Sequence, residues 1–195
     1  TLSVPVQPFH TYCFVVVASP GPGLPNSISN RTCLLTDYPG LPTFNYLRTV
    51  TVSGERELTV VDSVDASALV RGYRLERSEN GAPYEEVAFM GPTAGSLLVF
   101  TDTDVEPSRS GSRYRMVVVD DCGNDALTSN IGSSILLSAR PDLNGVNTLA
   151  WNGYQLWDGV LAAHRVYRQV EQGPEELLQV VPPQPWTLTD DVSAF

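Results

Sequence analysis

The sequence predicts an all-β protein built from β-sandwich modules in tandem, and three observations lead to this prediction. Helical periodicity is nearly absent, while alternating or continuous apolar runs of strand length dominate the 195 residues. Clusters of turn-forming residues separate these runs, which is typical of a sandwich or barrel with many short strands. Two groups of segments also occur twice in the chain, in the same order.

Short apolar runs recur along much of the chain, and we expect each of them to form a strand. Clusters of Gly, Pro, Asn and Asp lie between the runs, as at residues 20–25, 79–83 and 121–124, and such clusters favour turns. The expected strands are Tyr12–Val17, Leu47–Val52, Leu58–Val61, Tyr73–Arg77, Leu97–Phe100 and Tyr114–Val119.

The first repeated group is a β-branched strand, a turn-rich loop and a second strand that opens at a Ser-Asn pair. The two alignable first strands are Tyr12–Val17 and Tyr114–Val119, so that Tyr12 corresponds to Tyr114. The Ser-Asn pairs are Ser29-Asn30 and Ser129-Asn130, and the second strands are Cys33–Leu35 and Ser134–Leu137. We therefore predict two equivalent hairpins.

The second repeated group is a strand that ends in Arg, a Gly-containing turn and an apolar-Thr-Asp corner. Gly72–Arg77 leads to the corner at Asp102, and Ala163–Arg168 leads to the corner at Asp190. In this alignment His164 corresponds to Tyr73, and Trp151 corresponds to Val61 on a core strand. Since both are ordinary strand positions, we expect His164 and Trp151 to pack and not to react.

The repeats set the boundaries that we expect for the modules. Residues 1–35 correspond to the last two strands of a preceding module, and residues 42–138 contain every segment once, close to the roughly 100 residues of such a sandwich. Residues 141–195 correspond to the first half of a following module. Residues 36–42 are predicted to be a short stiff linker because of Pro39, Gly40 and Pro42, and residues 140–145 a second junction.

The arrangement resembles fibronectin type III modules, both in the tryptophan pattern of Leu149–Trp151 and in the penultimate-strand pattern of Ser112–Val118. This resemblance implies tandem immunoglobulin-like/fibronectin type III β-sandwiches, one complete and two partial. More narrowly, the chain resembles the modules near the C-termini of gliding-motility-associated surface proteins of the Bacteroidota, which leave the cell by type IX secretion. The segments that carry the narrower resemblance are residues 72–78, 119–124, 129–132, 151–158, 166–169 and 189–192.

Charge and composition exclude several function classes. The net charge is −10, which disfavours nucleic acid and anionic membrane surfaces as partners. All 12 basic residues are arginine, so chemistry that needs a lysine, such as a Schiff base, a P-loop or a Lys–Asn isopeptide bond, is excluded. No apolar run is long enough to span a membrane, and the first residues do not have the pattern of a signal peptide. We expect no direct membrane insertion, and a chain that is mature or cut from something longer.

The three cysteines favour one disulfide. Cys13 and Cys33 lie one on each strand of a predicted hairpin, and a bond between them would be worth roughly 3 kcal/mol in the chain-entropy model; two buried thiols are the alternative. A disulfide fits an extracellular or cell-surface location. Cys122 lies in an acidic turn with Asp120 and Asp121, which disfavours a reactive thiolate, so we expect it to be packed or paired elsewhere.

No motif for catalysis, a metal or a cofactor is present, and we predict a protein that is not an enzyme and has no catalytic, metal-binding or cofactor-binding residue. Asp102, Asp104 and Glu106 could hold Ca²⁺ through their oxygens, but they lack the spacing of a known calcium loop. Capping of turns is the ordinary role of such residues.

Two positions are candidates for contact with sugars. Trp157, in the loop between Gly153 and Gly159, is a possible glycan contact because an exposed tryptophan can stack on a sugar ring. Asp62-Ser63-Val64 resembles the O-glycosylation acceptor motif of Bacteroidota, which makes Ser63 a possible modification site.

The sequence therefore favours a non-catalytic structural or adhesive segment of a secreted or cell-surface protein, made of spacer and protein–protein interaction modules. The expected partners are other modules of the same large protein or neighbouring subunits, with surface glycans as a further possibility. Two alternatives stay open. One is a carbohydrate-binding or accessory module of a secreted enzyme, and the other is a subunit of an extracellular filament completed by strand exchange.

Overall fold

The computed structural model describes residues 3–7, 9–36, 40–154 and 158–192, and all regular structure in these ranges is β-strand. The predicted all-β fold class is confirmed, and the strand order of a β-sandwich occurs in the chain once in full and once in part. The chain divides into two compact units, Thr1–Leu41 and Pro42–Phe195. No described segment is a helix long and apolar enough to cross a membrane.

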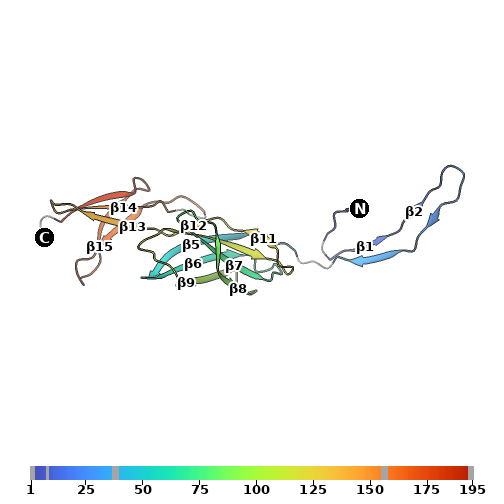
Figure 1. Ribbon diagram of the computed structural model, residues 1–195, viewed down its shortest axis with the longest axis horizontal. Helices are drawn as coiled ribbons and strands as arrows, with labels where there is room; N and C mark the ends of the chain where they lie inside the picture. The colour runs from blue at the N-terminus through green and yellow to red at the C-terminus, as the bar shows by residue number, and fades with distance from the viewer. Residues whose placement is uncertain (1–2, 8, 37–39, 155–157, 193–195) are drawn as a thin grey trace. The chain divides into compact units, whose positions relative to one another are not determined.

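The first unit is a single hairpin (Figure 1). Strand β1 (Thr11–Phe14) pairs antiparallel with β4 (Thr32–Leu35), and β2 (Val17–Ala18) pairs with β3 (Ser27–Ile28) farther toward the tip. A Gly- and Pro-rich segment, residues 19–26, closes the hairpin, as expected for residues that favour turns.

The second unit begins with a two-layer sandwich (Figure 1). One sheet has the strand order β5-β6-β9, and the other has the order β11-β10-β7-β8, with β12 also paired to β10. Strands of the first sheet are β5 (Asn45–Gly54), β6 (Glu57–Val64) and β9 (Leu97–Asp102). Strands of the second are β7 (Gly72–Glu79), β8 (Glu85–Met90), β10 (Ser112–Val119), β11 (Asp125–Thr128) and β12 (Gly132–Ser133).

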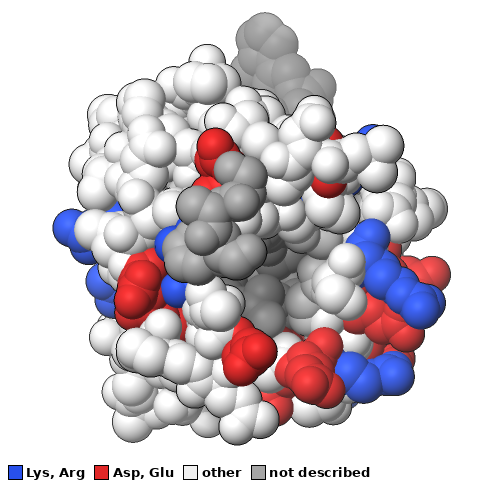
Figure 2. All heavy atoms as spheres, turned by 90° about the vertical axis from the view of Figure 1, so that its left-hand side faces the viewer, with Lys and Arg blue, Asp and Glu red and all other residues white. Residues whose placement is uncertain are grey.

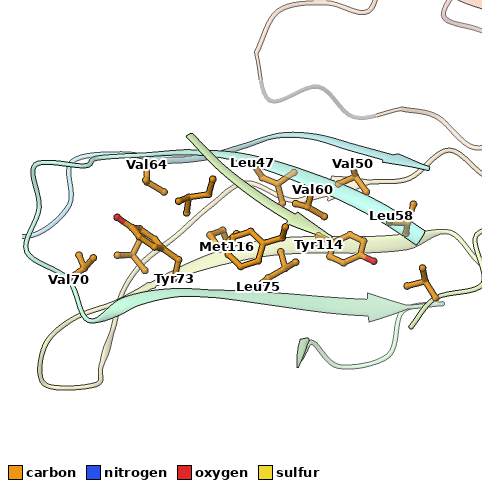
Figure 3. Close-up of a cluster of buried hydrophobic side chains, with 14 residues drawn as sticks. Leu47, Val50, Leu58, Val60, Val64, Val70, Tyr73, Leu75, Tyr114 and Met116 are labelled. Carbon is orange, nitrogen blue, oxygen red and sulfur yellow. The ribbon is translucent and has the colours of Figure 1, made fainter. Parts of the chain in front are cut away.

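The core lies between these two sheets. Along β6 buried and half-buried residues alternate strictly, because successive side chains of a strand point to opposite faces. Figure 3 shows Leu47 and Val60 of one sheet facing Met116 of the other. Full burial of an aliphatic side chain stabilises the fold by about 1.5–3 kcal/mol. The other buried apolar members of the cluster are Val50, Leu58, Val64, Val70, Tyr73, Leu75, Leu98, Phe100, Val105, Tyr114 and Val118.

The remaining strands repeat most of this arrangement. The order β13-β14-β17 corresponds to β5-β6-β9, and the pair β15-β16 corresponds to β7-β8. The strands are β13 (Leu137–Pro141), β14 (Val146–Trp151), β15 (His164–Arg168), β16 (Glu176–Val181) and β17 (Thr187–Asp191). Because β13 pairs with β14, the turn at residues 142–145, suggested by the sequence as a junction, closes this hairpin.

The strand register corrects one alignment of the sequence. Asn147 lies opposite Asp190, and Leu58 lies opposite Asp102, so Asn147 corresponds to Leu58. Four residues farther along each strand, Trp151 corresponds to Asp62. The sequence alignment placed Trp151 at Val61, which is wrong by one residue. A shift of one residue moves a side chain to the other face of a sheet. Trp151 is buried nevertheless, because Asp62 is itself a core-facing position.

Candidate interaction surface

The hairpin of residues 11–35 exposes apolar side chains that a complete sandwich would bury. Phe14 is 44% exposed and Val16 is 71% exposed, because a two-stranded hairpin has no second layer to cover it. An isolated hairpin is at best marginally stable in water, and a strand layer normally packs on another layer. The other exposed apolar residues of this hairpin are Val15, Val17, Leu24, Ile28, Leu34 and Leu35.

The same hairpin occurs a second time, in the complete sandwich. Cys13 pairs with Cys33 as Arg113 pairs with Ser133, and Val17 pairs with Ile28 as Val117 pairs with Thr128, so the correspondence is a shift of 100 residues on both strands. We call Thr11–Leu35 the first hairpin and β10–β12 the second hairpin. The predicted equivalence of the two hairpins is present, but the expected second strand at residues 134–137 is wrong. The strand that pairs with β10 is β12 at Gly132–Ser133, and Leu137 begins β13.

The register of the first strand differs from the sequence alignment by two residues. Phe14, and not Tyr12, corresponds to Tyr114, and Val16 corresponds to Met116. The error arises because the run of valines matches itself when it is shifted by two, and a shift of two keeps every side chain on the same face. In the second hairpin these two positions are fully buried in the core.

Serine side chains fix the same bend in both hairpins. The Ser29 amide donates to the Val16 carbonyl at 2.9 Å, and the Val16 amide donates to Ser29 Oγ at 2.9 Å. In the second hairpin the Ser129 amide donates to the Met116 carbonyl at 2.8 Å, and the Met116 amide donates to Ser129 Oγ at 2.8 Å. The following residue, Asn30 or Asn130, is therefore placed alike in both.

In the complete sandwich this asparagine holds a strand of the facing sheet. The Leu47 amide donates to Asn130 Oδ1 at 2.9 Å, and Asn130 Nδ2 donates to the Leu47 carbonyl at 3.0 Å. Asn45 Nδ2 adds a hydrogen bond to the Met116 carbonyl at 3.0 Å. The second hairpin thus recognises the main chain of β5. The corresponding Asn30 is exposed, and its Nδ2 donates to Thr32 Oγ1 at 3.2 Å.

A disulfide closes the first hairpin near its base. Cys13 and Cys33 lie directly opposite each other on β1 and β4 and are joined as the sequence predicted. They occupy the positions of Arg113 and Ser133, on the face that points away from the core in the second hairpin. The crosslink therefore keeps the hairpin closed without covering its core-facing side. Cys122 is a free, exposed thiol.

A buried polar corner joins the two sheets of the sandwich. Arg77 Nη1 donates to Asp102 Oδ2 at 2.7 Å, and the Tyr114 hydroxyl donates to the same oxygen at 2.8 Å. Burial raises the pKa of Tyr114 above its ordinary value, and the neighbouring Asp102 raises it further. In the partial sandwich Arg168 and Asp190 make the same ion pair at 3.0 Å.

The hydrogen bonds of this corner engage both carboxylate oxygens of Asp102. Its carboxylate is engaged by Arg77 and Tyr114, and its other oxygen accepts the Asp104 amide at 3.1 Å. Among the described residues no three His, Cys, Asp or Glu side chains are grouped so that they could hold a metal ion. The carboxylate thus stabilises the junction of β7, β9 and β10.

A second buried carboxylate has no such partner. Asp62 is fully buried on β6, between Leu47 on β5 and Leu98 on β9. Neither of its oxygens has a hydrogen-bond partner among the described residues, and burial raises the pKa of Asp62 to about 8. By contrast, hydrogen bonds from Ser67 and Thr43 hold the pKa of Asp65 well below its ordinary value.

The predicted sugar contacts lie in different surroundings. Trp157 lies outside the described residues. Trp151 is buried and packs edge-on against His164, with 5.5 Å between the ring centroids, and Trp186 lies against Gly153. Ser63 is half-buried on the central strand β6, opposite Tyr46 and Leu97, and its modification stays a prediction.

Charged side chains are mixed on the surface. In Figure 2 arginine side chains lie next to acidic ones, and wide uncharged areas separate one charged group from the next. Ion pairs of the described residues include Arg74 with Asp125 at 2.8 Å and Arg109 with Glu106 at 3.0 Å. The arginines thus lie beside carboxylates and do not form a separate basic face on the side shown.

No family model matches the chain, and no curated protein matches it either. A β-1,2-glucanase from Parabacteroides distasonis is a similar solved structure, with 18% identity and a TM-score of 0.34 over 55% of this chain and 15% of the glucanase. The FN1–FN3 domains of chicken CNTN1 are similar with 15% identity and a TM-score of 0.36, over 94% of this chain and 67% of that one. The chain therefore spans a small part of the glucanase, and its fold class rests on its own strand order and register.

Proposed function

We propose that this chain is a non-catalytic structural and interaction segment of a secreted or cell-surface protein. The observation that carries this proposal is the serial repetition of one strand order, β5-β6-β9 with β7-β8, in β13-β14-β17 with β15-β16. Sandwiches that follow one another along a chain are suited to a spacer, because each folds around its own core and the next continues from it.

Two of the carboxylates that are held by hydrogen bonds support a structural role. Asp102 is held by Arg77 and Tyr114, and Asp65 is held by Thr43 and Ser67. A carboxylate whose oxygens are already paired is poorly placed to act as a general base, since a base must reach the proton that it removes. Asp102 is the last residue of β9 and Asp65 directly follows β6, so each carboxylate joins one element to the next.

The disulfide supports a location outside the cytoplasm. Disulfides such as Cys13–Cys33 persist in oxidising compartments and are rare in the cytosol. The sequence resemblance extends this proposal to the surface proteins of the Bacteroidota that are associated with gliding motility and exported by type IX secretion. That parent class rests on the order of short motifs such as Gly72–Arg77 and Ser129–Gly132.

Labelling of intact cells tests the proposed location. An antibody raised against residues 42–138 should label intact cells of the source organism or its culture medium. Protease added outside the cells should remove the cell-bound label. Label that is found only after the envelope has been permeabilised would contradict the proposal. A cytoplasmic protein that stays protected from the protease is the control.

Contact with glycans remains a separate hypothesis for Trp157. A glycan array of the chain compared with Trp157→Ala measures it directly. Binding that is lost in the variant would support an additional adhesive role, whereas no binding, or equal binding by both proteins, would remove it. Trp151→Phe is the control at a buried position, since Trp151 is covered by the fold.

A further inference from the structure

We propose that Ser134 and Asn152 lock the junction between the complete sandwich (β5–β12) and the partial sandwich (β13–β17), so that the two move as one stiff body. Both sandwiches belong to the compact unit Pro42–Phe195. Residues 134–136 are the whole connection between β12 and β13. The inference concerns this junction, goes beyond the proposed function and stands whether or not the chain acts as a spacer.

Ser134 is anchored to the complete sandwich. Its amide donates to the Ser112 carbonyl at 3.0 Å, and the Ser112 amide donates to Ser134 Oγ at 3.1 Å. Ser112 is the first residue of β10 and pairs with Glu79 on β7. Both serines are buried, and buried main-chain groups need a partner because water does not reach them. Ser134 is therefore held to the end of β10.

Asn152 belongs to the partial sandwich and binds the same connecting segment. It directly follows β14, whose last residue, Trp151, pairs with Leu137 on β13. Asn152 Oδ1 accepts a hydrogen bond from the Leu136 amide, and Asn152 Nδ2 donates to the Ser134 carbonyl at 2.9 Å. One side-chain amide, which carries both an acceptor and donors, therefore binds two main-chain groups of the connection.

Ser134 is thus shared by the two sandwiches. Its N–H and Oγ bind Ser112 of the complete sandwich, and its C=O binds Asn152 of the partial one. Domains that are joined by a free linker normally move relative to each other, because the φ and ψ angles of the linker can change. Here a bend at Ser134 would break one of the two sets of hydrogen bonds and leave polar groups without partners, which is unfavourable.

The surfaces beside the connection also lie close together. A Cβ at Gly111, just before β10, would lie 4.0 Å from Cβ of Leu136, which is an ordinary packing distance. Residues of both sandwiches line a groove of about 610 Å³, among them Arg113 of the complete sandwich and Ser138 of the partial one. A bend at the junction would change the width of this groove, so its shape depends on the same hydrogen bonds.

Distances between spin labels test the stiffness in the whole chain. The exposed thiol of Cys122 carries one label on the complete sandwich, and Arg165→Cys, at an exposed position of β15, carries the other. The reference pair is Cys122 with Glu85→Cys on β8, since both of these labels lie on the complete sandwich. Pulsed electron spin resonance should give distance distributions of equal width for the two pairs. A wider distribution for the pair that spans the junction would overturn the inference.

Asn152→Ala tests the contribution of the side-chain amide. The Leu136 amide loses its acceptor, and its hydrogen exchange should become roughly tenfold faster. Asn144→Ala, in the turn of the same β13–β14 hairpin, is the matched control and should leave this rate unchanged, because the Asn144 side chain binds Asp142 within the turn. Equal rates in the two variants would show that Asn152 does not hold the connection. Faster exchange throughout β14 would show that Asn152 supports the partial sandwich and not the junction.

An insertion of two glycines after Ile135 tests the spacing without changing a residue of either sandwich. Asn152 can then no longer bind Ser134 and Leu136 together, so the distribution between the labels on the two sandwiches should become wider than that of the reference pair. The reference pair should keep its width, since the complete sandwich is unaltered. A distribution across the junction that stays narrow would show that the two sandwiches are held by other contacts, which contradicts the role of Ser134 and Asn152.

Discussion

The side chain of Asn130 binds the main chain of Leu47 through both of its polar groups, across 83 residues of sequence. The amide spans the gap between the second hairpin and β5, which belong to different sheets. A buried main-chain N–H or C=O needs a partner, and here one side chain satisfies both groups of one residue. This contact therefore joins the two layers of the sandwich at a fixed register.

Replacement of Asn130 by Ala should destabilise the complete sandwich by about 2–4 kcal/mol, because both main-chain groups of Leu47 lose their partner. Urea unfolding of the chain and of the variant, monitored by circular dichroism, measures this difference in the free energy of unfolding. Asn144→Ala, at an exposed turn, is the control and should change the free energy of unfolding by less than about 0.5 kcal/mol. Equal effects of the two changes would show that the contact with Leu47 contributes nothing.

Asp62 should make the sandwich less stable as the pH rises. Its pKa is about 8 in the folded chain against 3.8 ordinarily. Between these values the unfolded chain releases a proton that the folded chain retains, so the free energy of unfolding falls with increasing pH. The contribution is of the order of 5 kcal/mol between about pH 4 and pH 8, and Asp62→Asn should remove it.

Unfolding of the chain and of Asp62→Asn at several pH values checks this expectation. The two curves should lie close together near pH 4, and the variant should be the more stable at pH 8. Asp65→Asn is a control of opposite sign, since the low pKa of Asp65 stabilises the fold above its ordinary pKa and this stabilisation is lost as the pH falls. Parallel curves for the chain and Asp62→Asn would contradict a protonated Asp62.

Arg77→Ala should be strongly destabilising, because it leaves the buried carboxylate of Asp102 without its cation. Removal of one partner from a buried pair costs about 3–5 kcal/mol. Thermal unfolding of the variant is the measurement. Arg109→Ala breaks an exposed ion pair with Glu106 and should cost no more than about 1 kcal/mol. Similar melting temperatures for the two variants would show that the corner at Asp102 does not join the sheets.

The length and spacing of the apolar runs, together with the turn-forming residues between them, were enough to predict the sheets. Apolar runs of strand length, such as Leu58–Val61, and the repeated Ser-Asn pair after each valine-rich strand predicted sandwich layers and two equivalent hairpins. The Cys13–Cys33 pairing followed from the hairpin. These features depend on residues that are close in sequence, so they can be found without knowing the structure.

Register and long-range contacts were beyond the sequence. The shift at Phe14 arises because the valine-rich strand matches itself equally well after a shift of two residues. The shift at Trp151 is visible only from the pairing of β14 with β17. Asp62 gave no signal, since a carboxylate within an apolar strand is expected to point outward, and its burial depends on strands from three parts of the chain. The pairing of Asn130 with Leu47 was likewise missed, although the repeated Ser-Asn pair marked its position.

Stretching of single molecules tests most directly the central claim that the chain is a spacer built around a complete sandwich with its own core. Held between stable handles, the complete sandwich should unfold in one step that releases about 300 Å of chain. Arg77→Ala should lower the force of that step. Gradual extension without a step, or only steps much shorter than this length, would contradict the account.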